Sequence, residues 1–295
     1  METDLEKTLR DYIKTIPSLP TSVTKVLEIC NNPQTSPADL NHVISLDPVL
    51  VGRVLKLINS AYYGMGQPVT SLARAIIMLG INTVKNLALS TAILDQFSSE
   101  KKSSGLDMEG FWRHSLCVGV SAKLLAKKRG IDSKLTEEYF TAGLLHDIGK
   151  IPLNAVLKKK YMLTVSAADR ERKSLFMAED STLGLNHCTT GAMISEAWKL
   201  EGAVGDTIIY HHDYAEYSGN NRDVLYSVIA ANQFASHSEI GFSGDRYPEK
   251  TGPMVWETLN VRREVFDEIE KNVNDEIEKA EIFLKIGHLG LQSTD

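Results

Sequence analysis

The 295-residue sequence has few of the residues that build disulfide scaffolds, zinc ribbons or membrane spans. Its three cysteines, Cys30, Cys117 and Cys188, are far apart and form no Cys-x-x-Cys pair, which predicts reduced, mostly buried thiols. No apolar run approaches the ~20 residues that a membrane-spanning helix needs. The N-terminus is too acidic and polar for a signal peptide. These absences predict a cytoplasmic protein that does not associate with a membrane.

An excess of positive charge is also absent. Lys and Arg number 32 against 38 Asp and Glu, so the formal net charge is −6. A nucleic-acid-binding surface needs clustered Lys and Arg to displace counterions from phosphates, so no nucleic-acid partner is expected. The sequence is 43% hydrophobic and 24% charged, which is ordinary for a folded protein, and its length accommodates two domains.

Helical periodicity and helix-capping residues are abundant. Ser36-Pro37, Asp47-Pro48 and Ser71 each place a capping side chain before an apolar pattern of helical spacing. Asn82 or Thr83 is the expected cap of the next helix. No stretch in the first half alternates with a period of two for long enough to predict a strand. The sequence therefore predicts an all-α fold.

A polar, serine-rich stretch at residues 98–107 separates two regions of helical pattern and predicts a linker. The expected organisation is an N-terminal helical bundle over residues 1–100 and a second helical domain over residues 105–295. We expect helices of the second domain at 110–129, 136–148, 160–180, 187–199, 203–212, 222–237 and 255–286. The last of these is charged and amphipathic, and could supply a homodimer surface.

Histidines are the candidate metal ligands of the second region. Five of the eight in the chain fall there in a suggestive pattern: His114, His146, His187, His211 and His212. His146-Asp147 lies between Leu144-Leu145 and Ile148, so apolar residues flank the pair. A buried carboxylate is costly unless a cation neutralises it, and a divalent metal with imidazole co-ligands is one such cation. A lone histidine is more often a satisfied core residue, whereas five beside an aspartate favour a metal site.

The residues after Asp147 predict a turn. Gly149 is expected to adopt the left-handed conformation that ends a helix, and Pro152 is expected to keep the helix ended. Lys150 lies within this turn. Its ammonium group could contact a phosphate or pair with a carboxylate.

Several segments between residues 15 and 215 resemble the HDOD family of bacterial signalling proteins. They are Ile16-Pro17-Ser18-Leu19-Pro20, Asp47-Pro48, Leu57–Tyr62 and Ala75–Gly80. The family is all-helical, is related to the HD superfamily of metal-dependent phosphohydrolases, and often lacks the catalytic His-Asp residues. The resemblance implies an HD-like helical domain behind the N-terminal bundle, and a regulatory or scaffold role with a signalling protein as partner.

The second half is similar to HD and HD-GYP phosphodiesterases. The matching residues are His114, His146-Asp147, Gly149-Lys150, His187 and His211-His212. This similarity implies that Asp147 bridges two metal ions, that His187, His211 and His212 complete one site, and that His114 and His146 serve the other. The acid expected on a later helix is replaced by Asn232, which implies weaker binding there. The implied cofactor is one or two divalent transition-metal ions, with Fe, Mn, Zn and Ni all compatible.

Two functions remain open at this point. In a metal-dependent phosphohydrolase, Asp147 would hold the ions and Lys150 would steady the phosphoryl oxygens of a nucleotide-like, phosphate-bearing ligand. In a regulatory protein, the same pocket would keep metal for structure or sensing, because the neutral Asn232 reduces or abolishes turnover. The Gly-Tyr-Pro signature does not follow His212, so the resemblance does not indicate cyclic di-GMP as the substrate.

Overall fold

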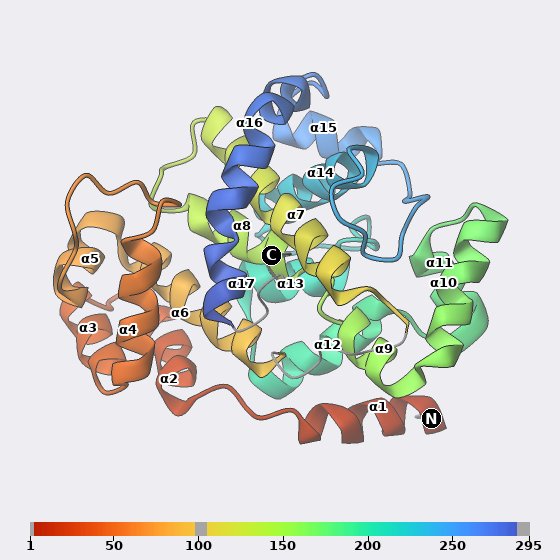
Figure 1. Cartoon of the computed structure of the whole chain (residues 1–295), viewed down its shortest axis with the longest axis horizontal. Coiled ribbons are helices and arrows are strands. Elements are labelled where there is room, and N and C mark those ends of the chain that lie inside the picture. The colour runs from red at the N-terminus through yellow and green to blue at the C-terminus, as the bar shows by residue number, and fades with distance from the viewer. Residues whose placement is uncertain (1–2, 98–104, 288–295) are drawn as a thin grey trace, which may run out of the picture.

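The computed structural model describes residues 3–97 and 105–287 (Figure 1). Within these ranges the regular structure consists of helices, which confirms the predicted all-α fold. The helices are α1 Asp4–Thr15, α2 Thr21–Cys30, α3 Pro37–Ser45, α4 Pro48–Ile58, α5 Leu72–Leu79, α6 Ile81–Gln96, α7 Met108–Lys128, α8 Thr136–Leu145, α9 Lys150–Leu157, α10 Lys159–Glu171, α11 Leu175–Leu183, α12 His187–Trp198, α13 Gly202–Tyr210, α14 Arg222–His237, α15 Pro253–Leu259, α16 Val265–Ala280 and α17 Ile282–Ile286. Most of the predicted linker, residues 98–104, lies outside the described residues.

The N-terminal helices begin where their capping residues predict. Ser36, Asp47 and Ser71 each accept a hydrogen bond from a backbone N–H in the first turn of α3, α4 and α5. The cap expected at Asn82 or Thr83 is wrong, because α6 begins at Ile81, immediately after Gly80. The φ of Gly80 is 88°, a conformation that glycine adopts without strain, and it allows α5 and α6 to meet at a sharp corner.

The single helix expected over residues 255–286 is also wrong. Asn260 adopts the left-handed conformation and ends α15, and a further break at Glu281 separates α16 from α17. The helix expected near 160–180 is likewise two helices, because Arg172 is left-handed and ends α10. A left-handed arginine is uncommon, so the break at Arg172 has no strong signal in the sequence, whereas asparagine is a residue type that can end a helix in this way.

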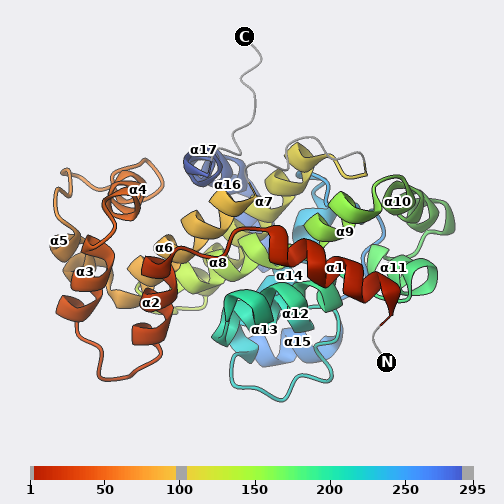
Figure 2. The same cartoon turned by 90° about the horizontal axis from the view of Figure 1, so that it is seen from below.

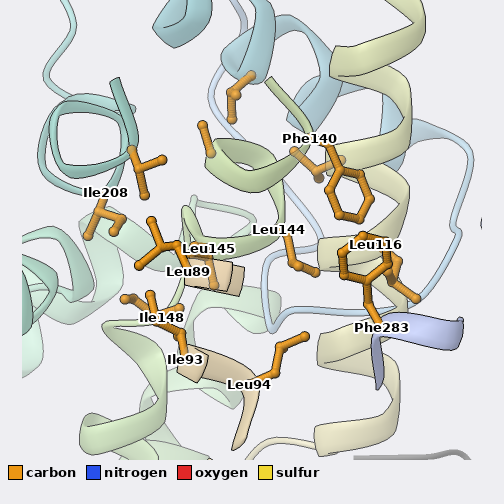
Figure 3. Packing of buried hydrophobic residues seen from close by; sticks show 14 of the residues in the cluster. Leu89, Ile93, Leu94, Leu116, Phe140, Leu144, Leu145, Ile148, Ile208 and Phe283 are labelled. Atoms are coloured by element: carbon orange, nitrogen blue, oxygen red, sulfur yellow. The ribbon is translucent and has the colours of Figure 1, made fainter. Parts of the chain in front are cut away.

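Helices α7 and α8 pack against each other at the centre of the molecule. α14 and α16 pack on α7, while α6 and α13 pack on α8. Figure 3 shows the apolar contact, where Leu89, Ile93 and Leu94 of α6 lie beside Leu144, Leu145 and Ile148, with Ile208 and Phe283 nearby. Burying each such side chain stabilises the folded protein by roughly 1.5–3 kcal/mol. This packing therefore holds the end of α8, and the residues that follow it, in place.

Helix α1 packs on the second half of the chain, against α9 and α12 (Figure 2). The buried hydrophobic residues form one cluster that extends from Leu9 to Ile286. The domain boundary near residue 100 stays a prediction. Among the described residues, no single helix is long and apolar enough to cross a bilayer, and only the bent pair of α5 and α6, at 118°, reaches that length and composition together.

Candidate metal centre

The turn between α8 and α9 carries His146 and Asp147 into the core, where each is only 1% exposed. Gly149 is right-handed in this turn, with φ −63°, so the predicted left-handed conformation is wrong. Glycine is required there for a different reason: a Cβ atom would lie 1.9 Å from the carbonyl oxygen of His187. The prediction that this position requires glycine is thus correct, but the physical reason is the close approach of α12 and not a left-handed conformation.

The sequence predicted that Pro152 would prevent the helix from continuing, and this prediction is wrong. Pro152 lies within the first turn of α9, which begins at Lys150. Proline is tolerated in a first turn because the N–H that it lacks has no partner within the helix. The turn between α8 and α9 is therefore short, and α9 begins three residues after Asp147.

Two imidazoles face Oδ1 of Asp147. Nε2 of His187, the first residue of α12, lies 3.4 Å from this oxygen. Nε2 of His211, the residue after α13, lies 3.5 Å from it, and the two nitrogens are 3.3 Å apart. Donor atoms about 2.1 Å from a tetrahedral ion stand about 3.4 Å from one another. The triangle therefore has the size that a divalent ion requires.

Three imidazole rings each donate a hydrogen bond from Nδ1 to a nearby acceptor, and this bond fixes the tautomer of the ring. Nδ1 of His146 bonds Gly143 O at 2.8 Å, Nδ1 of His187 bonds Glu179 Oε2 at 2.5 Å, and Nδ1 of His211 bonds Thr207 O at 2.9 Å. With the proton on Nδ1, the lone pair of each Nε2 is directed toward Asp147. Nε2 of His146 and Oδ1 of Asp147 are buried and have no hydrogen-bond partner among the described residues. Two buried acceptor atoms without a hydrogen-bond donor are suited to bind a metal cation.

Glu179 of α11 is a functional residue that the sequence reasoning missed. Its Oε2 accepts from the backbone N–H and the ring of His187, and its Oε1 accepts from the hydroxyl of Tyr161 at 2.6 Å. Burial opposes a charge on the ring, but in the absence of a metal Glu179 outweighs it and raises the pKa of His187 to about 9, so a metal ion that binds Nε2 would displace a proton from this ring. Glu179 follows Leu175 by four residues, so an acid on the buried side of a helix was the available signal.

Oδ2 of Asp147 already has a cation. Lys150 Nζ donates to it at 2.6 Å and to Ser243 Oγ at 3.3 Å, and Lys150 is 2% exposed. Nε2 of His146 lies 3.3 Å from the same oxygen. Burial alone would raise the pKa of Asp147, but its interactions with His146 and Lys150 hold it well below its ordinary value. Lys150 thus neutralises the buried carboxylate. The predicted contact of Lys150 with phosphoryl oxygens stays a prediction.

His114 of α7 completes a second group with His146 and Asp147, since one ligand atom from each lies within 4.8 Å of the others. Nε2 of His114, however, donates to Oδ1 of Asn232 at 2.9 Å. Burial, followed by the charge of His146, lowers the pKa of His114 to about 3, so this ring is neutral. Asn232 lies beside His114 and accepts its hydrogen bond, and its predicted role as a metal ligand stays a prediction.

His212 and Cys188 border the centre. The His212 ring stacks on Phe176 with centroids 4.5 Å apart, and its Nδ1 lies 3.5 Å from Glu249 Oε2. Within the described ranges His212 belongs to no close group of ligand atoms, whereas Cys188 groups with His187 and His211. Sγ of Cys188 lies 3.7 Å from Nδ1 of His211, the nitrogen that bonds Thr207. Cys188 therefore approaches the side of the ring that faces away from Asp147.

A cavity of about 440 Å³ opens beside these residues. Its lining includes His211, His212, Asn232, Tyr214, Glu249 and Lys250. The cavity thus combines imidazole, amide and charged groups with an aromatic wall. It is large enough for a small organic ligand next to the metal ligands.

Comparisons with known proteins agree with this fold. The family model of the HDOD domain matches residues 16–214. The solved structure of an HDOD domain protein of unknown function from Geobacter sulfurreducens is 25% identical, with a TM-score of 0.70 over 95% of this chain and 100% of that one. A structure from Shewanella amazonensis SB2B, whose name ascribes phosphohydrolase activity to it, is 23% identical, with a TM-score of 0.67 over 93% and 97%.

One curated relative is an uncharacterized protein of Treponema pallidum (strain Nichols). It is 26% identical over 234 residues, which make up 78% of this chain and 44% of that protein. The chain therefore spans less than half the length of this relative.

Proposed function

Because the chain belongs to the HDOD domain family, we propose that it is a regulatory protein of bacterial signalling that holds one divalent transition-metal ion between His187, His211 and Asp147. A signalling protein is its partner in this proposal, and the cavity beside the ion receives a phosphate-bearing small ligand. The homodimer suggested by the C-terminal region stays a prediction.

The observation that carries the proposal is the triangle of Nε2 of His187, Nε2 of His211 and Oδ1 of Asp147. Its edges of 3.3, 3.4 and 3.5 Å match the separation of metal ligands, and the carboxylate oxygen has no other hydrogen-bond partner in the described part of the chain. Glu179 holds the ring of His187 as a carboxylate that orients a metal-bound imidazole would. Imidazole with carboxylate suits Zn, Fe, Mn or Ni.

One ion, instead of two, is favoured by the environment of Oδ2. Lys150 places a positive charge 2.6 Å from this oxygen, where a second ion would also have to bind. His114 donates to Asn232 through the nitrogen that would otherwise be a ligand. A second cation would need to displace both contacts and to approach a buried ammonium group.

Metal analysis tests this proposal directly. The protein is purified without chelators, and its metal content is measured by inductively coupled plasma mass spectrometry. We expect about one ion per chain in the wild type and less than a tenth of that in Asp147→Asn. Asp213→Asn is the matched control, because it removes the same charge close to the site and should keep the ion. A wild-type protein that contains no metal and takes up none from micromolar Zn²⁺, Mn²⁺ or Fe²⁺ would refute the proposal.

A metal-dependent phosphohydrolase is the second candidate, favoured by the cavity of about 440 Å³ that adjoins His211 and His212. When bound, a divalent ion supplies Lewis-acid activation of water and of a phosphoryl oxygen. In this chain, Asp147 would hold the ion, and the Nε2 lone pairs of His187 and His211 would complete its ligands. Lys150 stays occupied by Asp147 and Ser243 unless a ligand displaces them.

Hydrolysis of an aryl phosphodiester with added Mn²⁺ or Fe²⁺ separates the two candidates. The regulatory proposal expects wild-type turnover no greater than that of Asp147→Asn. Turnover that depends on both metal and Asp147 would establish the enzyme instead.

A further inference from the structure

A second polar cluster lies where the N-terminal helices meet α7 and α8, away from the metal centre. Lys123 of α7 donates to Oε2 of Glu137 at 2.6 Å and to the hydroxyl of Tyr62 at 3.0 Å. Its ammonium group also lies 4.2 Å from the centre of the Tyr62 ring and 5.2 Å from that of Tyr63. The segment Leu57–Tyr62, which carries part of the family resemblance and has no role at the metal centre, ends at this cluster.

A cavity of about 170 Å³ opens beside Lys123. Its lining includes Tyr62, Tyr63, Met78, Lys127, Lys134 and Glu137. Glu137 lies in the first turn of α8, whereas His146 directly follows its last residue. Since a helix rises about 1.5 Å per residue, the cavity and the metal centre are separated by roughly 13 Å along α8. The two sites are therefore distinct.

The cavity has an excess of positive charge within a chain whose net charge is −6. Three lysines line it and Glu137 is the one carboxylate among its lining residues. Glu137 is engaged by Lys123, while Lys127 and Lys134 form no ion pair with any of the described residues. The ammonium groups of Lys127 and Lys134 are therefore available to an anion that enters the cavity.

The same cavity contains unused hydrogen-bonding groups. Glu137 is 1% exposed, and its buried Oε1 has no partner at hydrogen-bond distance among residues 3–97 and 105–287. The buried hydroxyl of Tyr63 also lacks such a partner, and burial followed by the nearby charge of Glu137 raises the pKa of Tyr63 well above its ordinary value. A buried carboxylate oxygen that accepts no hydrogen bond costs about 1–3 kcal/mol. A ligand with a hydroxyl group would remove this cost by donating to Oε1.

We propose that this cavity binds a small hydroxylated organic phosphate, with its phosphate group between Lys127 and Lys134 and a hydroxyl group donating to Glu137. A phosphate monoester carries about −1.5 to −2 charges at pH 7, which matches two free ammonium groups better than a single carboxylate does. The volume of about 170 Å³ is well below the 440 Å³ of the cavity beside the metal centre, which favours a small ligand here.

Isothermal titration calorimetry with glycerol 3-phosphate, at constant ionic strength, tests the proposal. The wild type should bind it, and should bind inorganic phosphate and glycerate at least fivefold more weakly, because the first lacks the carbon-borne hydroxyl group and the second carries one charge. Lys127→Gln and Lys134→Gln should each weaken binding about tenfold. Both side chains are exposed at the rim, so these variants should fold, which thermal unfolding verifies.

Lys128→Gln is the matched control. Lys128 neighbours Lys127 on α7 but pairs with Glu268, away from the cavity, so its loss should leave the affinity unchanged. Equal weakening by all three substitutions would show that only the general surface charge matters and would overturn the proposal. An affinity that the Lys127 and Lys134 variants do not change would show that the phosphate binds elsewhere and would also overturn the proposal, as would no binding at millimolar glycerol 3-phosphate.

Discussion

The two oxygens of Asp147 lie in different environments, although they are parts of one buried carboxylate. Oδ1 faces two imidazole nitrogens, whereas Oδ2 accepts from the ammonium group of Lys150. His187 and His211 are held by acceptors that leave their Nε2 lone pairs free, while Nε2 of His114 is used in a hydrogen bond. One side is arranged for a metal ion and the other has its charge satisfied by the protein.

This difference favours one metal ion over two in the proposed site. A buried carboxylate must be neutralised, and either a metal ion or a lysine meets that need. Where Asn232 stands in place of an acid, the second half lacks a negative charge that would attract another ion. The lysine then provides the neutralising charge permanently, independent of metal supply.

The largest effect that tests this comparison is expected from Lys150→Met. Removing the cation leaves the charge of Asp147 buried and unpaired at Oδ2, which costs about 3–5 kcal/mol. Urea unfolding in the presence of a chelator should show this loss, and added metal should restore part of it. Lys128→Met, which breaks an exposed pair, should have a much smaller effect. A loss below about 1 kcal/mol for Lys150→Met would mean that Lys150 is not the required cation.

His211→Ala and His114→Ala compare the two sides directly. His211→Ala should weaken metal binding more than about 100-fold, since it removes a ligand whose loss exceeds the 10–100-fold cost of an outer partner. His114→Ala should weaken it only a few-fold. Competition with a fluorescent chelator measures both affinities. Equal losses for the two variants would contradict the asymmetry.

Glu179→Gln tests whether Glu179 orients the ring of His187 toward Oδ1 of Asp147. A glutamine preserves the shape but not the charge that holds the ring of His187, so metal affinity should fall about 10–100-fold while one ion still binds at saturation. The same chelator competition reports this change. Glu171→Gln, on the neighbouring helix and exposed, should leave the affinity as it is. An unchanged affinity in Glu179→Gln would remove Glu179 from the site.

The smallest effect is expected from Asn232→Asp. A carboxylate at this position would add a negative charge beside His114 and should raise the occupancy of a second ion. Because Lys150 still occupies Oδ2, we expect a partial gain, measured as ions per chain at saturating Mn²⁺. Occupancy that stays at one ion would contradict the two-site assignment that the resemblance implies.

Much of the fold and the candidate site could be predicted from local sequence signals. Ser36, Asp47 and Ser71 act as caps through contacts within one helical turn, so the sequence nearby is sufficient to locate them. The break at Arg172 was missed because arginine gives no local signal for a left-handed residue. The break at Asn260 was missed because the prediction rested on apolar periodicity, although asparagine is a residue type that adopts this conformation after helices. Glu179 was missed because its importance depends on a partner on the next helix.

By itself the sequence determined the helical class, the starts of the helices capped by Ser36, Asp47 and Ser71, and the histidines that gather around Asp147. Those properties follow from side-chain type and spacing along the chain. Only the tertiary structure decided which oxygen of Asp147 each group faces, that Lys150 is taken up by Oδ2, and that Gly149 is needed for the approach of α12. These depend on how α8, α9, α12 and α13 pack, and distances of a few ångströms between separate helices are set by that packing alone.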